Sequence, residues 1–317
     1  MERAEGDAIG AIEVCENIAS KVAFTPPGSD ELLQVLRTVP DARPSSDVVR
    51  EVKGILGTSA GGERPKLTVF HEGQWWLAKL QDRGDRPHAP LREFVAMRVA
   101  RACGVNAAEV QFRGVGAREV LLVRRFDRRV VDGHVTRHLY ASAHTALRLD
   151  KHVGGDRDRS YVALGSELSR WCATAARNEV LELRRELWRR IVLNSVLGNG
   201  DDHPRNTGLL HDGAGWTLAP AFDIAPHGIA FAGVQSMDVS RSRQHPASSA
   251  AFNLIAAAPD YGYDADEATA FLRQVREAVP GLWRELVAAG FAPDAIELQN
   301  PDWLDRPAPI PPGRGRP

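Results

Sequence analysis

The feature that most constrains this chain is a long amphipathic stretch that runs directly into a cluster of polar side chains. Residues 179–197 place Leu183, Leu187 and Ile191 in one stripe, with Arg and Glu opposite, which predicts a helix buried along one face. The residues that follow, 198–206, hold two acids, two amides and one imidazole. Burying polar groups at the end of such a helix costs free energy, so we expect the functional site there.

The spacing inside this cluster indicates a particular chemistry. Asn206 stands five positions after Asp201, the same interval that separates the proton-accepting Asp from the magnesium-holding Asn in protein-kinase catalytic loops. A further acid, Asp223, follows the short strand-like run 216–218. Asn206 and Asp223 are therefore candidate metal ligands and Asp201 a candidate base, whereas Asp202 is expected to face solvent or a neighbouring Arg.

A Gly-rich segment precedes a predicted hairpin in the N-terminal half. Residues 67–70 and 73–80 alternate as strands do, with Lys66 before the first and Lys79 in the second. Only five lysines occur among the 40 basic residues, and a compact ammonium is not interchangeable with a guanidinium at a phosphate. Glycine backbone and a following Lys can meet the same phosphate. The candidate nucleotide-binding residues here are Ser59, Gly61, Gly62, Lys66 and Lys79, although an ordinary loop is the alternative.

Two further elements extend this half of the chain. Residues 91–103 have helical apolar spacing, and Glu93 in the first turn is either a solvated charge or the carboxylate that holds Lys79. Residues 119–123 form an apolar strand that leaves into a charged segment. The edge of that strand could hydrogen-bond an adenine.

Composition excludes several classes of protein. With 317 residues, 43% hydrophobic and 26% charged, the chain is typical of globular proteins. A net charge of −1 provides no global field for nucleic acid or an anionic membrane, so direct nucleic-acid binding is not expected. Three widely separated cysteines, no signal peptide and no membrane-length apolar run predict a cytoplasmic protein with no membrane association.

Taken together, these residues resemble the HipA family of bacterial serine/threonine kinases. Five segments carry the resemblance in order, namely 61–66, 76–79, 123–128, 200–206 and 220–223. The Arg-Phe-Asp-Arg and Asp-x-His-x-x-Asn segments are specific as a pair. The resemblance covers roughly residues 50–290.

The resemblance implies an α+β, bilobal protein-kinase-like (HipA-type) fold that binds ATP and Mg²⁺, with a small β-rich N-lobe and a mostly α-helical C-lobe. On this basis residues 1–50 would be a short, partial N-terminal subdomain and 51–128 the N-lobe with Gly-rich loop, ATP lysine and hinge. Residues 129–295 would be the helical C-lobe with the catalytic loop. Residues 296–317, rich in Pro, are expected to be a flexible tail.

The resemblance also implies roles for single residues. Lys79 would contact the ATP phosphates, the backbone at Arg124 and Phe126 would hold the adenine, and Asp127 would lie near the ribose. Asp201 would be the catalytic Asp, and Asn206 with Asp223 would hold the metal. Lys66, Gly61 and Gly62 would line the nucleotide site, and His203 would join them there while bracing the loop. Ser59 is nearest to the serine whose autophosphorylation ejects the Gly-rich loop in this family.

Three departures from the family pattern stand out. Residues 221–224 are not Asp-Phe-Gly, Arg124 stands where a Glu often occurs, and the portion before the Gly-rich loop is short. The family implies a protein substrate, in some members an aminoacyl-tRNA synthetase, and in many operons a HipB-like helix-turn-helix antitoxin. A separate partner could complete the short N-terminal portion.

The expected function is transfer of the ATP γ-phosphate to a protein hydroxyl by a toxin-like kinase acting on translation. One alternative is a nucleotide-binding pseudokinase that serves as a regulatory module. Another is a metal-dependent phosphoesterase, in which Asp201, Asp202, His203 and Asp223 would seat two divalent ions. The second alternative leaves Lys79 and the Gly-rich segment without a role.

Overall fold

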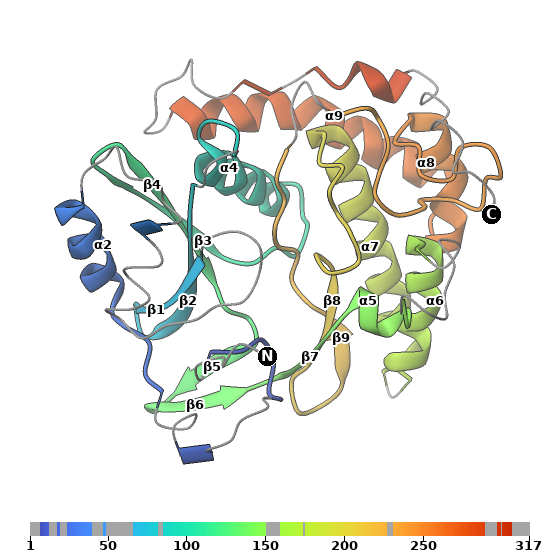
Figure 1. Cartoon of the computed structure of the whole chain (residues 1–317). Coiled ribbons are helices and arrows are strands. Elements are labelled where there is room, and N and C mark those ends of the chain that lie inside the picture. The colour runs from blue at the N-terminus through green and yellow to red at the C-terminus, as the bar shows by residue number, and fades with distance from the viewer. Residues whose placement is uncertain are drawn as a thin grey trace, which may run out of the picture. The chain divides into compact units, whose positions relative to one another are not determined.

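The hairpin expected at residues 67–80 is present in the computed structural model of the chain and forms one side of a four-stranded antiparallel sheet (Figure 1). The strand order is β1-β2-β4-β3, so β2 lies between β1 and β4. The strands are β1 (Lys66–His71), β2 (Gln74–Leu80), β3 (Val110–Val115) and β4 (Arg118–Arg124). The register pairs Lys66 with Lys79 across the hairpin.

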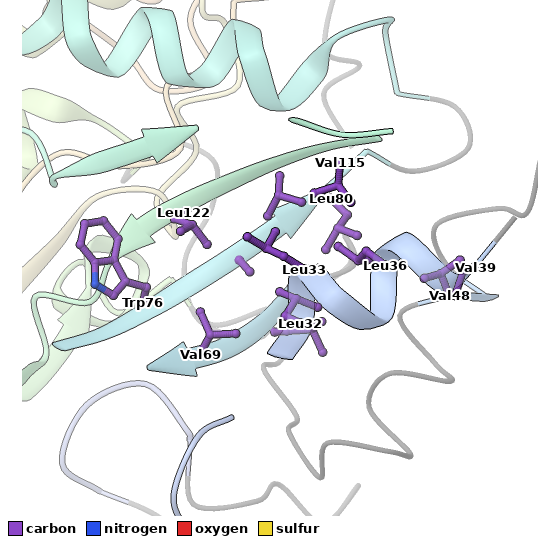
Figure 2. Packing of buried hydrophobic residues seen from close by; sticks show 13 residues of the cluster. Leu32, Leu33, Leu36, Val39, Val48, Val69, Trp76, Leu80, Val115 and Leu122 are labelled. Carbon is purple, nitrogen blue, oxygen red and sulfur yellow. The ribbon is translucent and has the colours of Figure 1, made fainter. Parts of the chain in front are cut away.

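One face of this sheet packs against helix α2 (Ser29–Thr38) (Figure 2). Alternate residues of the strands, such as Val69, Trp76 and Leu80, belong to one buried cluster with Leu32 and Leu36 of the helix, as the period of two in a strand requires. Burying an aliphatic side chain of this kind contributes about 1.5–3 kcal/mol. This cluster is the core that holds the strand carrying Lys79.

Further elements extend the chain from the sheet. Helix α4 (Ala89–Ala102) follows β2, and after β4 come the paired strands β5 (Arg128–Val131) and β6 (His134–Arg137), then β7 (Leu139–Ser142). The Gln74 side chain bonds the backbone of Val130 through both its oxygen and its nitrogen. These bonds tie the β5-β6 hairpin to β2.

Helices dominate the C-terminal part, where α7 (Arg177–Leu197) is the central element (Figure 1). Of its predicted apolar stripe, Leu187 and Ile191 are fully buried and Leu183 is half-buried. The other helices are α5 (Ala143–Ala146), α6 (Tyr161–Trp171), α8 (Ala251–Ala257), α9 (Ala265–Ala288) and the 3₁₀ turns η3 (Ala258–Tyr261) and η4 (Asp302–Asp305). Strands β8 (Gly208–His211) and β9 (Trp216–Leu218) form a sheet of order β7-β8-β9.

Helix α9 continues through a proline without a break. It runs as one helix through Pro280. Leu272, Val275, Val279 and Trp283 continue a single buried stripe across the proline. Packing along that stripe outweighs the hydrogen bond that the proline removes.

The chain divides into two compact units. The first comprises Met1–Phe94 and Ala108–Tyr140, and the second Val95–Ala107 and Ala141–Pro317. The first unit therefore extends beyond the expected boundary at 128, because the β5-β6 hairpin belongs with the sheet. Residues described by the structure are 7–12, 18–19, 24–39, 47–48, 66–81, 85–149, 159–173, 175–226, 231–288, 297–298 and 300–305.

The expected tail differs from the structure in its first part. Residues 302–305 form η4, and Trp303 and Leu304 are buried. Large apolar side chains within the Pro-rich composition explain the difference, because they have a core to pack into. Among the residues that the structure describes, none of the helices combines the length and the hydropathy of a membrane span.

Candidate active site

The end of α7 delivers the polar segment through two glycines. Gly198 adopts the left-handed conformation, φ 69°, and its N–H donates to the Asn194 carbonyl, the usual way to end a helix. The Asn199 N–H donates to the same carbonyl at 2.8 Å. A Cβ at Gly200 would lie 2.8 Å from a ring carbon of Phe231. Both glycines are therefore required by the turn that leads into Asp201.

Asp201 itself is exposed, and the loop around it is closed by hydrogen bonds to its backbone. The His203 N–H donates to the Asp201 carbonyl at 2.8 Å, and the Asn206 carboxamide nitrogen donates to the same oxygen at 3.0 Å. The Asn206 N–H in turn donates to the His203 carbonyl. His203 is thus part of the loop's frame, and the Asn206 side chain uses its nitrogen to hold the loop.

Asp202 does not face solvent, which corrects the expectation for this residue. It is 6% exposed. Its carboxylate accepts hydrogen bonds from Tyr161 Oη at 2.7 Å, Asn194 Nδ2 at 2.8 Å and Thr207 Oγ1 at 3.3 Å. Burial raises the pKa of Asp202, although the Tyr161 hydrogen bond and the Arg190 charge oppose that effect. Adjacent acids therefore have opposite environments, one exposed and one anchored in the core.

The far side of the loop rests on α5. The Ala143 N–H donates to the Thr207 carbonyl at 2.7 Å and the His144 N–H to the Pro204 carbonyl at 2.8 Å. These are N–H groups of the first turn of a helix, which have no partner within the helix itself. The loop is therefore held by backbone as well as by side chains.

Asp223 follows β9 on a segment whose backbone is hydrogen-bonded to Gly208 and to Asn106. The Ala219 N–H donates to the Gly208 carbonyl, and the Ala221 N–H to the Asn106 carbonyl, both at 2.8 Å. Asp223 has a positive φ of 59°, a conformation uncommon for residues other than glycine. Such backbone strain persists where the surroundings impose it and is concentrated at functional sites.

The second unit also carries a buried ion pair that sequence reasoning missed. Glu186 Oε1 accepts from Arg190 Nε at 2.9 Å and from the Asn106 N–H at 2.9 Å. Burial lowers the pKa of Arg190, and Glu186 opposes that shift. Because Asn106 also binds Ala221, this pair links α7 to the segment that leads to Asp223.

In the first unit, Lys79 and Lys66 are cross-strand partners, so their side chains leave the same face of the sheet. Lys79 Nζ contacts Glu93 Oε1 of α4 at 2.6 Å, with the two side chains 15% and 6% exposed. Of the two expectations for Glu93, the structure confirms the contact with Lys79 and not the solvated charge.

Arg124, the last residue of β4, and Phe126 lie where the chain leaves the sheet. The Arg124 N–H donates to the Glu109 carbonyl at 2.8 Å, so this N–H is already used within the sheet. Phe126 is half-buried, with its ring 6.0 Å from that of Tyr140. The Arg124 N–H is therefore not available to another acceptor in this arrangement.

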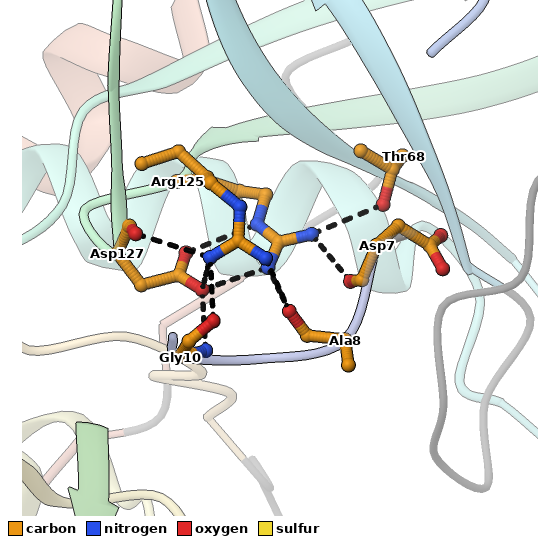
Figure 3. A network of polar contacts seen from close by, with 7 residues as sticks. Asp7, Ala8, Gly10, Thr68, Arg125 and Asp127 are labelled. Atoms are coloured by element: carbon orange, nitrogen blue, oxygen red, sulfur yellow. Dashed lines mark hydrogen bonds and ion pairs between the residues drawn. The ribbon is translucent and has the colours of Figure 1, made fainter. Parts of the chain in front are cut away.

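Asp127, expected near a ribose, is buried in a polar network (Figure 3). Its Oδ2 accepts from Arg125 at 2.7 Å, from Arg128 at 2.9 Å and from the Gly10 N–H at 2.8 Å. The two guanidiniums also donate to the carbonyls of Asp7, Ala8 and Gly10. Burial opposes ionisation, but the arginines lower the pKa of Asp127. Asp127 therefore fastens the segment around Gly10.

Not every expected residue can be placed. Ser59, Gly61 and Gly62 lie outside the described residues. Within the described part of the chain, no three His, Cys, Asp or Glu side chains gather as a metal cluster. The buried Asp202 carboxylate is already bound by Tyr161, Asn194 and Thr207, which disfavours the phosphoesterase alternative, because that alternative needs Asp202 as a ligand.

Sequence comparison places the chain among known proteins. A sequence model of the HipA-like C-terminal domain matches residues 58–283. The chain is 26% identical to the serine/threonine-protein kinase toxin HipA of Shewanella oneidensis over 52% of this chain and 42% of that protein. It is 25% identical to the protein Y4mE of Sinorhizobium fredii over 71% of this chain and 56% of that protein. The chain thus spans about half the length of these relatives.

A solved structure agrees with the expected fold. HipA of Shewanella oneidensis, in complex with HipB and its operator DNA, matches with a TM-score of 0.60 at 19% identity, covering 88% of this chain and 68% of that chain. The fold is therefore α+β and kinase-like, with a β-rich first unit and a mostly helical second unit, as the family resemblance implied.

Proposed function

We propose that this chain, which belongs to the family of the HipA-like C-terminal domain, is a serine/threonine protein kinase that transfers the ATP γ-phosphate to a protein hydroxyl. The observation that carries the proposal is the loop at the end of α7. It presents Asp201 to solvent while Asn206 and the buried Asp202 hold it on either side. An exposed acid on a rigid frame is what a hydroxyl acceptor requires.

Asp201 is proposed to orient the acceptor hydroxyl and to take its proton late in the transfer. Asn206 and Asp223 are proposed to hold Mg²⁺ through oxygen atoms, the ligands this ion prefers. The Asn206 nitrogen already binds the Asp201 carbonyl, so its oxygen is the atom suited to a cation. When bound, the ion would neutralise charge on the phosphates.

Lys79 is proposed to contact the ATP phosphates. Its contact with Glu93 fixes the ammonium on the sheet, and Lys66 on the same face adds a second positive charge. We extend the nucleotide site to His203, to backbone atoms at Arg124 and Phe126, and to Gly61 and Gly62. Ser59 is proposed as a site of autophosphorylation. Asp127 is left out, since its carboxylate is buried in the network with Arg125 and Arg128.

Substrates and partners are proposed from the family. A protein acceptor, an aminoacyl-tRNA synthetase among the candidates, would make the chain a toxin that acts on translation. The related Shewanella oneidensis HipA assembles with HipB, and a HipB-like antitoxin is the proposed partner here. The remaining alternative is a pseudokinase that binds nucleotide without transferring phosphate, which the retained Lys79, Asp201, Asn206 and Asp223 disfavour.

A thermal-shift series with ATP and Mg²⁺ beside an ADP-release assay separates these functions. A kinase should be stabilised by ATP with Mg²⁺ and should release ADP. Asp201→Asn should keep the stabilisation and lose the turnover, whereas Lys79→Met should lose both. Stabilisation without turnover in the wild type would leave the pseudokinase, and hydrolysis of phosphatase substrates without ATP binding would leave the phosphoesterase.

A further inference from the structure

The C-terminal segment, residues 300–305, packs against the helix that delivers the active-site loop. Trp303 is 8% exposed and Leu304 is 1% exposed. The exposed side of the segment is tied to α9, because Arg276 Nη1 donates to Asp305 Oδ1 at 2.7 Å. The matched family region ends at residue 283, so the segment 300–305 lies outside it.

Trp303 satisfies a backbone group at the end of α7. Its indole Nε1 donates to the Ser195 carbonyl at 2.8 Å in a buried position. Ser195 lies in the last turn of the helix, where carbonyls lack the N–H of a following turn. The indole therefore takes the place of the hydrogen bond that the helix cannot supply.

The same ring packs against the glycine that turns the chain. A Cβ at Gly198 would lie 3.3 Å from Cζ2 and Cη2 of Trp303. Phe231 meets the indole edge to face, with ring centroids 5.0 Å apart, and covers Gly200 from the other direction. Gly200, the residue before Asp201, thus packs against the Phe231 ring, which in turn packs against Trp303.

The loop that carries Phe231 is fastened to the same helix residue. The Ser195 hydroxyl donates to Ser249 Oγ at 3.1 Å, and Gln235 Nε2 contacts both hydroxyls. A Cβ at Gly233 would lie 3.1 Å from Cβ of Trp303. Ser195 therefore joins the end of α7, the Phe231 loop and the C-terminal segment in one buried cluster.

We propose that Trp303 is a positioning residue for phosphoryl transfer, acting through Gly198, Phe231 and Gly200 to fix the backbone of Asp201. This rests on the proposed function of Asp201. Trp303 contacts the end of α7, the turn that follows it and the Phe231 loop. Loss of the indole should therefore loosen residues 198–206 before it unfolds the second unit. Misplacement of a base by a fraction of an ångström lowers the rate of transfer more than it lowers nucleotide binding.

The first test is hydrogen exchange of the full chain, followed on peptides that span 198–206. The Asn199, His203 and Asn206 N–H groups report directly, because each donates to a backbone carbonyl of this turn. In Trp303→Ala these amides should exchange on the order of tenfold faster. The control is Trp283→Ala, which removes a buried tryptophan from α9 and should not accelerate these amides selectively.

The second test is kinetic and uses a graded set. Trp303→Ala should lower kcat about tenfold to a hundredfold with the KM for ATP within about twofold. Trp303→Phe keeps a ring but loses the Nε1 donor, and should recover part of the rate. Asp305→Ala weakens only the exposed attachment to Arg276, so it should fold normally and lower kcat less than Trp303→Ala does. Glu277 is an exposed acid beside Arg276 in α9, and Glu277→Ala should leave kcat unchanged.

These outcomes separate two failures. If the wild type transfers no phosphate, the proposed function fails, while the exchange result still decides whether Trp303 orders the loop. Unchanged exchange at 198–206 in both Trp303 variants, or a change equal to that of Trp283→Ala, would overturn the proposal. If Trp303→Ala does not fold, Trp303→Phe and Asp305→Ala carry the same decision.

Discussion

Replacing Asp202 with alanine should destabilise the second unit strongly, although the residue performs no proposed chemistry. The change removes the acceptor of Tyr161, Asn194 and Thr207. Each buried donor left without a partner costs about 1–3 kcal/mol. Tyr161 keeps a second acceptor, the Asp202 carbonyl at 3.2 Å, and the Thr207 bond is long at 3.3 Å, so we expect a total in the lower part of the range for two donors, about 2–4 kcal/mol. That corresponds to a fall in Tm of about 5–15 °C.

Asp202→Asn is the matched variant, because it keeps the shape and one acceptor oxygen. Burial raises the pKa of Asp202. A carboxyl with a raised pKa in the folded state contributes stability at low pH, and this contribution is lost as pH rises from the unfolded pKa through the folded one. The stability of the wild type relative to Asp202→Asn should therefore increase as pH falls from 7 toward 4.

Urea unfolding followed by fluorescence, at several pH values, measures both effects. Asp202→Ala should have the lowest midpoint, with Asp202→Asn between it and the wild type. An Asp202→Ala variant within about 0.5 kcal/mol of the wild type would refute the reasoning, because the carboxylate would then not anchor the loop. A difference between wild type and Asp202→Asn that does not change with pH would refute the assignment of a raised pKa.

Three further predictions concern the remaining contacts. Glu93→Gln should lower kcat/KM for ATP about tenfold to a hundredfold because it releases Lys79, and Lys79→Met should lower it further. Equal kcat/KM values for Glu93→Gln and the wild type would show that the Lys79–Glu93 contact at 2.6 Å is not needed. Asp127→Ala should cost about 3–5 kcal/mol by leaving Arg125 and Arg128 buried without their partner, and KM for ATP should not change. The arginines lower the pKa of Asp127, so the stability that Asp127 contributes should be present above the unfolded pKa and be lost as pH falls through the folded pKa. A KM for ATP that rises in Asp127→Ala would instead support a contact between Asp127 and the ribose. Burial raises the pKa of Cys103 to about 11. In a Cys15→Ser chain, the Cys103 thiol should therefore react with iodoacetamide at pH 8 on the order of a hundredfold more slowly in the folded protein than after unfolding. Equal rates in the two states would contradict this prediction.

Periodicity explains what the sequence could predict. Strand alternation identified the β1-β2 hairpin, and the apolar stripe identified α7 to within two residues at its start. The five-position interval from Asp201 to Asn206 drew attention to a loop in which the two residues do contact each other, although their predicted roles remain proposals. These features depend on residues that are near one another in the chain, where spacing and hydrogen-bonding partners are both visible.

The features that sequence reasoning missed depend on distant partners. Asp201 and Asp202 are identical in type, and only Tyr161 and Asn194 decide which of them is buried. Asp127 finds Gly10 across 117 positions. Trp303 was hidden in a Pro-rich composition, yet it lies against Ser195, 108 positions earlier. No local pattern reports a contact of that kind, although a large aromatic side chain within a proline-rich stretch is a usable signal.

The central claim is that Asp201 supports phosphoryl transfer from ATP, and one measurement tests it most directly. Purified wild-type protein, Asp201→Asn and Ser59→Ala are incubated with ATP labelled at the γ-phosphate and with Mg²⁺, and any labelled residue on the protein is mapped. We expect label at Ser59 in the wild type and none in either variant, with Asp201→Asn still stabilised by ATP. A wild type that takes up no label, turns over no ATP and gains no stability from it would contradict the claim.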